Sequence, residues 1–283
     1  MSQLKIFINI TRLNRPIGFM LLFWPCMIGL TYAYQINQNL KLLIFFSFLF
    51  FIGSILMRSA GCIFNDIIDK DVDKKVFRTK NRPIPKGLIS ISRAFIYVVI
   101  LCLLALLILL QFNYFTILLG FTSMFFAFAY PFMKRITYWP QLFLGLTFNW
   151  GIIMGWTSVF PELNYEIIIL YVAAIFWTLG YDTIYGLQDV NDDEIIGMKS
   201  TSIKFKKNPK IFIGFCYSCT TLLIACLFKD SLNFNFKSIF FFIFVLTLVL
   251  QIYIFNFNKP KDCLKAFKLN NFSGLTLFLY ILI

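Results

Sequence analysis

Long apolar runs recur throughout this chain, and they constrain its fold more than any other feature. A helix needs roughly 20 apolar residues to cross the hydrocarbon core of a bilayer. The 283 residues are 59% hydrophobic and 14% charged, which is far more apolar than an ordinary soluble domain. We therefore predict an all-α, multi-pass membrane domain covering residues 1–283, with about nine transmembrane helices bundled around a central active-site cavity. The runs lie near residues 17–34, 42–64, 94–111, 114–133, 139–160, 165–187, 209–229, 238–257 and 269–283.

Basic residues favour alternate loops, which predicts the orientation of the chain. The N-terminal segment and the loops after the even-numbered runs hold most of them, whereas the opposite loops offer only Lys41, Lys229 and Lys237. Because positively charged loops stay in the cytoplasm, we expect the N-terminus to lie inside. The same distribution accounts for the net charge of +13, so nucleic-acid binding is not expected. Without an Arg- and Ser-rich presequence, a bacterial inner membrane is favoured over a mitochondrial membrane.

Acidic residues collect in two clusters, and each cluster follows a predicted span on the cytoplasmic side. The first cluster comprises Asp66, Asp69, Asp71 and Asp73, and the second comprises Asp182, Asp189, Asp192, Asp193 and Glu194. Their positions after the second and sixth runs suggest two halves, residues 1–135 and 136–283.

Helical spacing selects some of these carboxylates. On a continuous helix that advances 100° per residue, one set from each cluster falls within a sector of roughly 60° or less. The sets are Asp66, Asp69 and Asp73, and Asp182, Asp189 and Asp193, with Tyr185 near the second. Like charges on one helix face repel each other, so we expect a cation to neutralise them. Mg²⁺ fits, because it prefers oxygen and is usually held by one or two carboxylates plus substrate phosphates. The alternative is that these are solvated helix ends whose acids pair with nearby lysines.

The motifs closely resemble those of the UbiA superfamily of intramembrane prenyltransferases. The NDxxDxxxD signature occupies residues 65–73, and RTxxRPxPxG occupies residues 78–87. The second signature, YDTxY followed by DxxxD, occupies residues 181–193. Residues 15–18 (RPIG) and 130–135 (YPFMKR) resemble further family segments. YDTxY and YPFMKR are similar in particular to the 4-hydroxybenzoate polyprenyltransferases of ubiquinone synthesis.

The resemblance implies a reaction and a role for each candidate residue. A polyprenyl group would pass from its diphosphate to the ring carbon beside the hydroxyl of 4-hydroxybenzoate. Mg²⁺ and the diphosphate would be held by Asp66, Asp69, Asp73, Asp189 and Asp193, with Asn65 as their companion. Arg135 is the first candidate for a phosphate clamp or for binding the acceptor carboxylate, followed by Arg15, Arg78, Arg82 and Lys199. The acceptor or its leaving proton would be positioned by Asp182 and Tyr185.

Two other interpretations stay open. A relative that prenylates haem or dihydroxynaphthoate shares the first signature more loosely. A secondary transporter also places charges inside a helix bundle, although its sites lie near the middle of the bilayer. The sequence predicts neither the prenyl chain length nor the oligomeric state.

Overall fold

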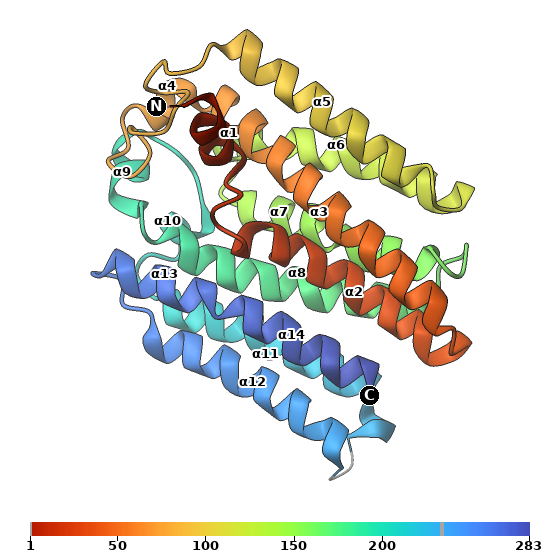
Figure 1. Cartoon of the computed structure of the whole chain (residues 1–283). Coiled ribbons are helices and arrows are strands. Elements are labelled where there is room, and N and C mark those ends of the chain that lie inside the picture. Colours follow the sequence, from red (N-terminus) through yellow and green to blue (C-terminus); the bar gives the residue numbers. More distant parts are fainter. Residues whose placement is uncertain (1, 233–234) are drawn as a thin grey trace.

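The computed structural model describes residues 2–232 and 235–283, and in these ranges the chain contains helices and no strand (Figure 1). The elements are α1 (Gln3–Thr11), α2 (Ile17–Asn37), α3 (Leu40–Ile68), α4 (Lys70–Asp73), α5 (Ile91–Leu109), α6 (Tyr114–Ile136), α7 (Pro140–Thr157), α8 (Tyr165–Gly186), α9 (Val190–Ile195), α10 (Thr201–Lys204), α11 (Pro209–Leu227), η1 (Lys229–Ser231), α12 (Phe236–Ile254), α13 (Pro260–Lys268) and α14 (Asn270–Leu282). The predicted all-α class is confirmed.

Each apolar run of the sequence coincides with a helix. Among the described residues, seven helices are long and apolar enough to cross a membrane, namely α2, α3, α5, α6, α8, α11 and α12. The other two long elements are α7, with 18 residues, and α14, with 13 residues. The chain is a multi-pass membrane protein, and the predicted count of about nine spans is larger than this set of seven.

The long helices form a bundle with α8 in its interior (Figure 1). The most apolar stretch of α8 is 72% buried, whereas those of α5 and α6 are 17% buried and face outward. Helix α2 packs against α3, α7 and α14, and α8 packs against α7 and α11. In Figure 1, α5 and α6 lie along one side of the bundle and α11, α12 and α14 along the other.

Small residues let α2 and α7 approach closely. A Cβ atom added at Gly29 would lie 1.9 Å from the backbone oxygen of Ile152, and one at Gly155 would lie 2.2 Å from that of Cys26. Without a hydrophobic driving force between helices in lipid, such close backbone packing supplies the attraction.

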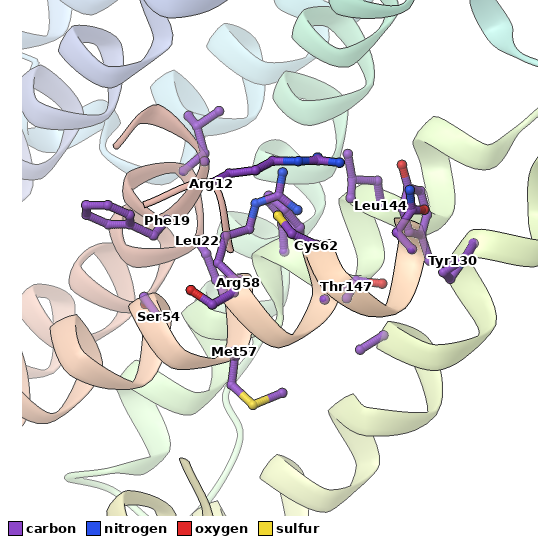
Figure 2. Close-up of a pocket in the computed structure, with 18 of the residues that line it drawn as sticks. Arg12, Phe19, Leu22, Ser54, Met57, Arg58, Cys62, Tyr130, Leu144 and Thr147 are labelled. Atoms are coloured by element: carbon purple, nitrogen blue, oxygen red, sulfur yellow. The ribbon is translucent and has the colours of Figure 1, made fainter. Parts of the chain in front are cut away.

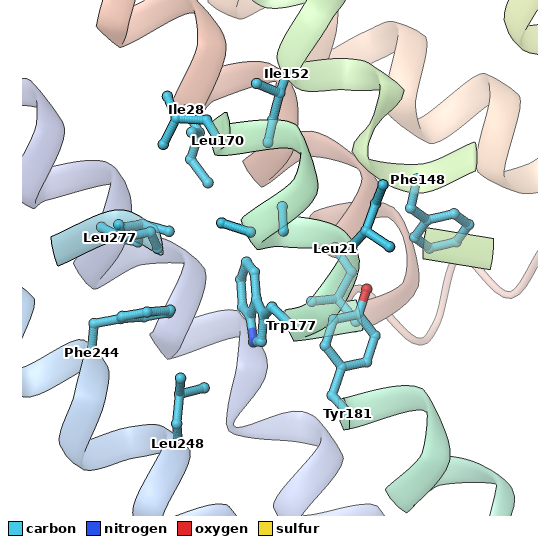
Figure 3. Packing of buried hydrophobic residues seen from close by; sticks show 14 of the residues in the cluster. Leu21, Ile28, Phe148, Ile152, Leu170, Trp177, Tyr181, Phe244, Leu248 and Leu277 are labelled. Carbon is cyan, nitrogen blue, oxygen red and sulfur yellow. The ribbon is translucent and has the colours of Figure 1, made fainter. Parts of the chain in front are cut away.

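The largest buried cluster joins α2, α7, α8, α12 and α14 around Trp177 (Figure 3). Phe244 lies 5.7 Å from the Trp177 ring in an edge-to-face arrangement, and the indole N–H donates to Asn270 at 2.7 Å. This buried polar contact is satisfied, as the apolar surroundings require. The cluster holds α8 in place, and the second aspartate motif follows directly from the end of that helix.

The short elements α1, α4, α9, α10 and α13 gather at one end of the bundle (Figure 1). Both aspartate motifs lie at this end. Here the structure corrects the assumption of continuous helices: α3 ends at Ile68, and α4 restarts at Lys70. Likewise α8 ends at Gly186, and Asp189 is the N-cap of α9. The carboxylates of each motif therefore project from the end of a long helix and from the short segment that follows it, rather than from one helical face.

Candidate active site

A cavity of about 1470 Å³ opens at the end of the bundle that carries the aspartates. Its polar mouth includes Asp69, Asp73, Asp189 and Asp193. Its wall then follows α3 down to Leu49, which is 20 residues before Asp69, or about 30 Å along the helix axis. The deeper lining from α3, α5 and α6 is mostly apolar. The cavity can thus hold a charged group at one end and a long apolar chain behind it.

The first aspartate motif is buried and paired with basic side chains. Asp66 accepts hydrogen bonds from Arg12 at 2.5 Å and from Arg82 at 2.9 Å. The same Arg82 nitrogen donates to Asp73 at 2.7 Å. Arg12 adopts a φ of 56°, which is uncommon for a residue other than glycine and stores strain at this site. Charge-assisted pairs of this kind are stronger than neutral hydrogen bonds, so the motif is held rigidly.

Asp69 points toward a different partner, the Lys134 ammonium group at the end of α6. Its second carboxylate oxygen, Oδ1, is buried without a hydrogen-bond partner and lies 3.6 Å from a nitrogen of Arg135. Burial raises the pKa of the Asp69 carboxyl group, and Lys134 offsets part of that rise. An ionised oxygen with free lone pairs is the kind of ligand that a hard cation binds.

The second motif faces a loop that follows the first. Arg78 donates from Nε to both oxygens of Asp189 at 2.8 Å and from Nη1 to the Tyr185 hydroxyl at 2.9 Å. Burial lowers the pKa of the Arg78 guanidinium, but Tyr185 and Asp189 outweigh it and raise the pKa overall. Burial, together with the charge of Asp189, raises the pKa of Asp193 to about 6. The two motifs therefore meet through a residue of the first motif's own loop.

Arg58 is a charged residue deep in the cavity, 11 residues before Asp69 and so about 16 Å farther along α3. Its guanidinium lies 5.3 Å from the centre of the Phe148 ring, and its Nε is buried without a hydrogen-bond partner. Figure 2 shows it reaching from α3 into the cavity, with Tyr130 on the far side of the same pocket. Asp182 of α8 lies within its electrostatic range. A guanidinium inside a cavity, with a buried nitrogen that has no hydrogen-bond partner, is suited to binding an anionic group.

Most of the residues singled out from the sequence line this cavity. They are Asn65, Asp69, Asp73, Asp182, Tyr185, Asp189, Asp193, Arg15, Arg78, Arg82 and Lys199. Asp66 lies behind Arg12 and Arg82 and does not line it. Arg135 is outside the lining too, and it donates to the backbone oxygen of Ile68 at 2.8 Å. The remaining acids pair elsewhere: Asp71 with Lys74, Asp192 with the Phe77 backbone N–H, and Glu194 with Lys206.

Sequence reasoning missed Arg12, Arg58 and Lys134. Arg58 carried a usable signal, because it is a charged residue inside the apolar run 42–64, and charges within a span mark functional positions. Lys134 and Arg135 are adjacent in the sequence, and only the helix orientation shows that Lys134 lines the cavity. Arg12 carries no such signal, because it stands among the basic residues of the N-terminal segment that membrane topology already explains.

The chain belongs to the UbiA prenyltransferase family, whose pattern matches residues 22–275. It is 36% identical to the 4-hydroxybenzoate octaprenyltransferase of Vibrio atlanticus, over 97% of this chain and 95% of that protein. It is 40% identical to the mitochondrial 4-hydroxybenzoate polyprenyltransferase of Drosophila melanogaster, over 100% of this chain and 72% of that protein. Its fold matches a UbiA homolog from Archaeoglobus fulgidus bound to GPP and Mg²⁺, with a TM-score of 0.72 and 17% identity, covering 98% of this chain and 100% of that one.

Proposed function

We propose that this protein transfers a polyprenyl group from polyprenyl diphosphate to the ring carbon ortho to the hydroxyl of 4-hydroxybenzoate. Diphosphate is released, and the product serves ubiquinone biosynthesis. The observation that carries the proposal is the likeness, at 36% and 40% identity over nearly the whole chain, to proteins named for this transfer. The cavity supports it independently, because a charged mouth and a long apolar interior match a diphosphate and its prenyl chain.

Mg²⁺ is the cofactor that the mouth would hold together with the diphosphate. The free Oδ1 of Asp69 fits such a cation. Among the described residues, no three acidic, histidine or cysteine side chains converge closely enough to hold a metal by themselves. The metal would therefore be shared between phosphate oxygens and Asp69, Asp73, Asp189 and Asp193, with Asn65 beside them. Asp66 would support this site from behind by holding Arg12 and Arg82. When bound, Mg²⁺ supplies Lewis-acid polarisation of the phosphate oxygens. Binding of Mg²⁺ by the Archaeoglobus homolog supports this assignment.

Basic side chains at the mouth stabilise the departing diphosphate. Arg82, Lys134, Arg78 and Arg15 line the cavity beside the aspartates. As the bond between the allylic carbon and the diphosphate oxygen breaks, negative charge grows on the leaving group, and these preorganised cations stabilise it. Lys199 lines the same region, and its ammonium group donates to the backbone oxygen of Ile136 at 3.1 Å.

Arg58 is better placed than Arg135 to bind the acceptor carboxylate. Its side chain lies inside the cavity, whereas that of Arg135 does not. With the carboxylate held by Arg58, the ring carbon beside the hydroxyl attacks the allylic cation and forms the new carbon–carbon bond. The ring then loses its proton to Asp182, with Tyr185 one helical turn farther along α8, and aromaticity is restored. The apolar lining excludes water, which would otherwise convert the cation to an alcohol.

The proposal includes a location. The basic loops support a cytoplasmic N-terminus, with both aspartate motifs at the cytoplasmic face of a bacterial inner membrane. There the soluble acceptor can reach the mouth of the cavity while the donor chain remains among the helices. We also propose that the chain acts as one domain.

Incubation of membranes containing the protein with 4-hydroxybenzoate, Mg²⁺ and prenyl diphosphates of graded length tests the proposal. Mass spectrometry should detect a ring-prenylated hydroxybenzoate. Parallel incubations with haem and with dihydroxynaphthoate test the other acceptors, and a product from either of these alone would contradict the assignment. Ion-driven uptake into proteoliposomes without any covalent product would instead favour a transporter.

A further inference from the structure

Basic side chains from this chain already neutralise the aspartates of the proposed metal site. Asp66 and Asp73 share Arg82, and Asp69 contacts Lys134. Lys134 belongs to α6, whereas Arg82 belongs to the irregular segment between α4 and α5. The second motif depends on that same segment, because its Asp189 is held by Arg78.

Arg78 forms what we call the latch, comprising Arg78, Asp189 and Tyr185. Both oxygens of Asp189 accept hydrogen bonds from the guanidinium. The Tyr185 hydroxyl accepts a further bond at 2.9 Å, and the guanidinium carbon lies 5.2 Å from the centre of the tyrosine ring. Beside the latch, the backbone N–H of Phe77 donates to Asp192 at 2.9 Å. The loop is thus fastened to α8 and α9 at neighbouring points.

We propose that Arg78 is a positioning residue that makes the second motif accept a divalent cation together with a diphosphate rather than alone. The inference rests on the metal–diphosphate part of the proposed function. With both Asp189 oxygens engaged, a free cation must displace the guanidinium and leave it without its anionic partner. A diphosphate that binds together with the cation gives Arg78 a new anionic partner, because phosphate oxygens accept the same bidentate hydrogen bonds from arginine.

The competition has a measurable consequence. When a site is blocked for most of the time, its apparent affinity equals the intrinsic affinity multiplied by the fraction of molecules in which the site is open. Hydrogen bonds to charged groups in a partly buried setting are strong enough to reduce that fraction about tenfold or more. Removal of the latch should therefore strengthen the binding of free metal, a direction that mere structural damage does not produce.

Titration of the purified full-length protein with Mn²⁺ alone, followed by electron paramagnetic resonance, tests the inference. We expect Arg78→Gln to bind Mn²⁺ about tenfold more tightly than the unmodified protein. The same variant should show a higher KM for polyprenyl diphosphate, because the guanidinium that would bind the phosphate is gone. Lys80→Gln is the matched control: it removes one positive charge from an exposed residue of the same loop, whose side chain lies over Phe77. Its Mn²⁺ affinity should stay close to that of the unmodified protein.

Tyr185→Phe provides a second variant that keeps every charge. It removes one of the latch contacts, so Mn²⁺ binding should strengthen by a smaller factor than in Arg78→Gln. Unchanged or weaker binding in both variants would overturn the latch. So would an equal gain in Lys80→Gln, which would indicate general electrostatics. The product assay is separate: failure to prenylate 4-hydroxybenzoate contradicts the acceptor assignment, whereas an unchanged metal affinity in Arg78→Gln contradicts only the latch.

Discussion

The two aspartate motifs look alike in the sequence but differ in how the fold supports them. The first is almost fully buried, with Asp66 1% and Asp69 0% exposed, and its partners come from α1, α6 and the segment before α5. The second depends on Arg78 of that same segment, whose side chain is 31% exposed, against 19% for Arg82. From this comparison we expect the first half of the site to be preformed and the second half to rearrange when the substrate binds.

Removal of the metal should have the largest effect on turnover, and it distinguishes a role of the metal in catalysis from a role in stability. With a chelator such as EDTA, turnover should fall to background, because the leaving diphosphate loses its Lewis acid. The thermal unfolding midpoint should stay unchanged, since basic side chains already neutralise the first motif. Excess Mg²⁺ should restore turnover, and turnover that persists in the chelator would exclude the metal.

Substitution of one aspartate from each motif compares the halves directly. Asp69→Asn and Asp189→Asn should each lower kcat/KM by about a hundredfold, because each weakens the electrostatic grip on the diphosphate. Only Asp69→Asn should also lower thermal stability, since it leaves Lys134 without its buried partner.

Asp71→Asn serves as the control for both substitutions. Asp71 is an exposed residue that pairs with Lys74 at 3.2 Å. Near-normal turnover is expected for this variant, whereas near-normal turnover of Asp69→Asn would contradict the metal assignment.

Loss of the deep arginine should affect only the acceptor. Arg58→Gln should raise the KM for 4-hydroxybenzoate by about ten- to a hundredfold, the value of a charge-assisted hydrogen bond. The KM for the donor should change little. For the neutral analogue 4-hydroxybenzamide, the KM should be similar in the variant and in the unmodified protein. Arg93→Gln, at the exposed start of α5, is the control. Equal losses for both acceptors would argue against a carboxylate contact.

The smallest expected effect is on stability. Arg82→Gln removes the shared partner of Asp66 and Asp73, so we expect it to destabilise the fold by about 2 kcal/mol. Arg78→Gln should change stability less, because Arg78 has one carboxylate partner and its side chain is 31% exposed, whereas Arg82 has two carboxylate partners and is 19% exposed. Thermal unfolding in detergent measures both, and equal destabilisation would remove the distinction between a rigid half and a rearranging half.

Local sequence patterns were sufficient for the helices and for the motifs. Apolar runs of about the length of a bilayer predict the long helices, because lipid requires backbone hydrogen bonds to be satisfied within each segment. Asp66, Asp69, Asp189 and Asp193 could be identified as candidates from the sequence, because acidic residues at the ends of apolar spans are costly and usually serve a function. The prediction that each set of aspartates lies on one continuous helix is wrong, because α3 ends at Ile68 and α8 ends at Gly186.

The sequence by itself determined the class of fold and marked the acidic residues that are candidates for the site. Only the tertiary structure decided which cations they meet. Arg78 and Asp189 are 111 positions apart, Lys134 and Asp69 are 65 apart, and neither pairing leaves a periodic trace in the chain. The shared position of Arg58 and Asp182 on the wall of one cavity is likewise a product of helix packing. Periodicity reports the neighbours along one helix, whereas partners on different helices depend on how those helices pack together.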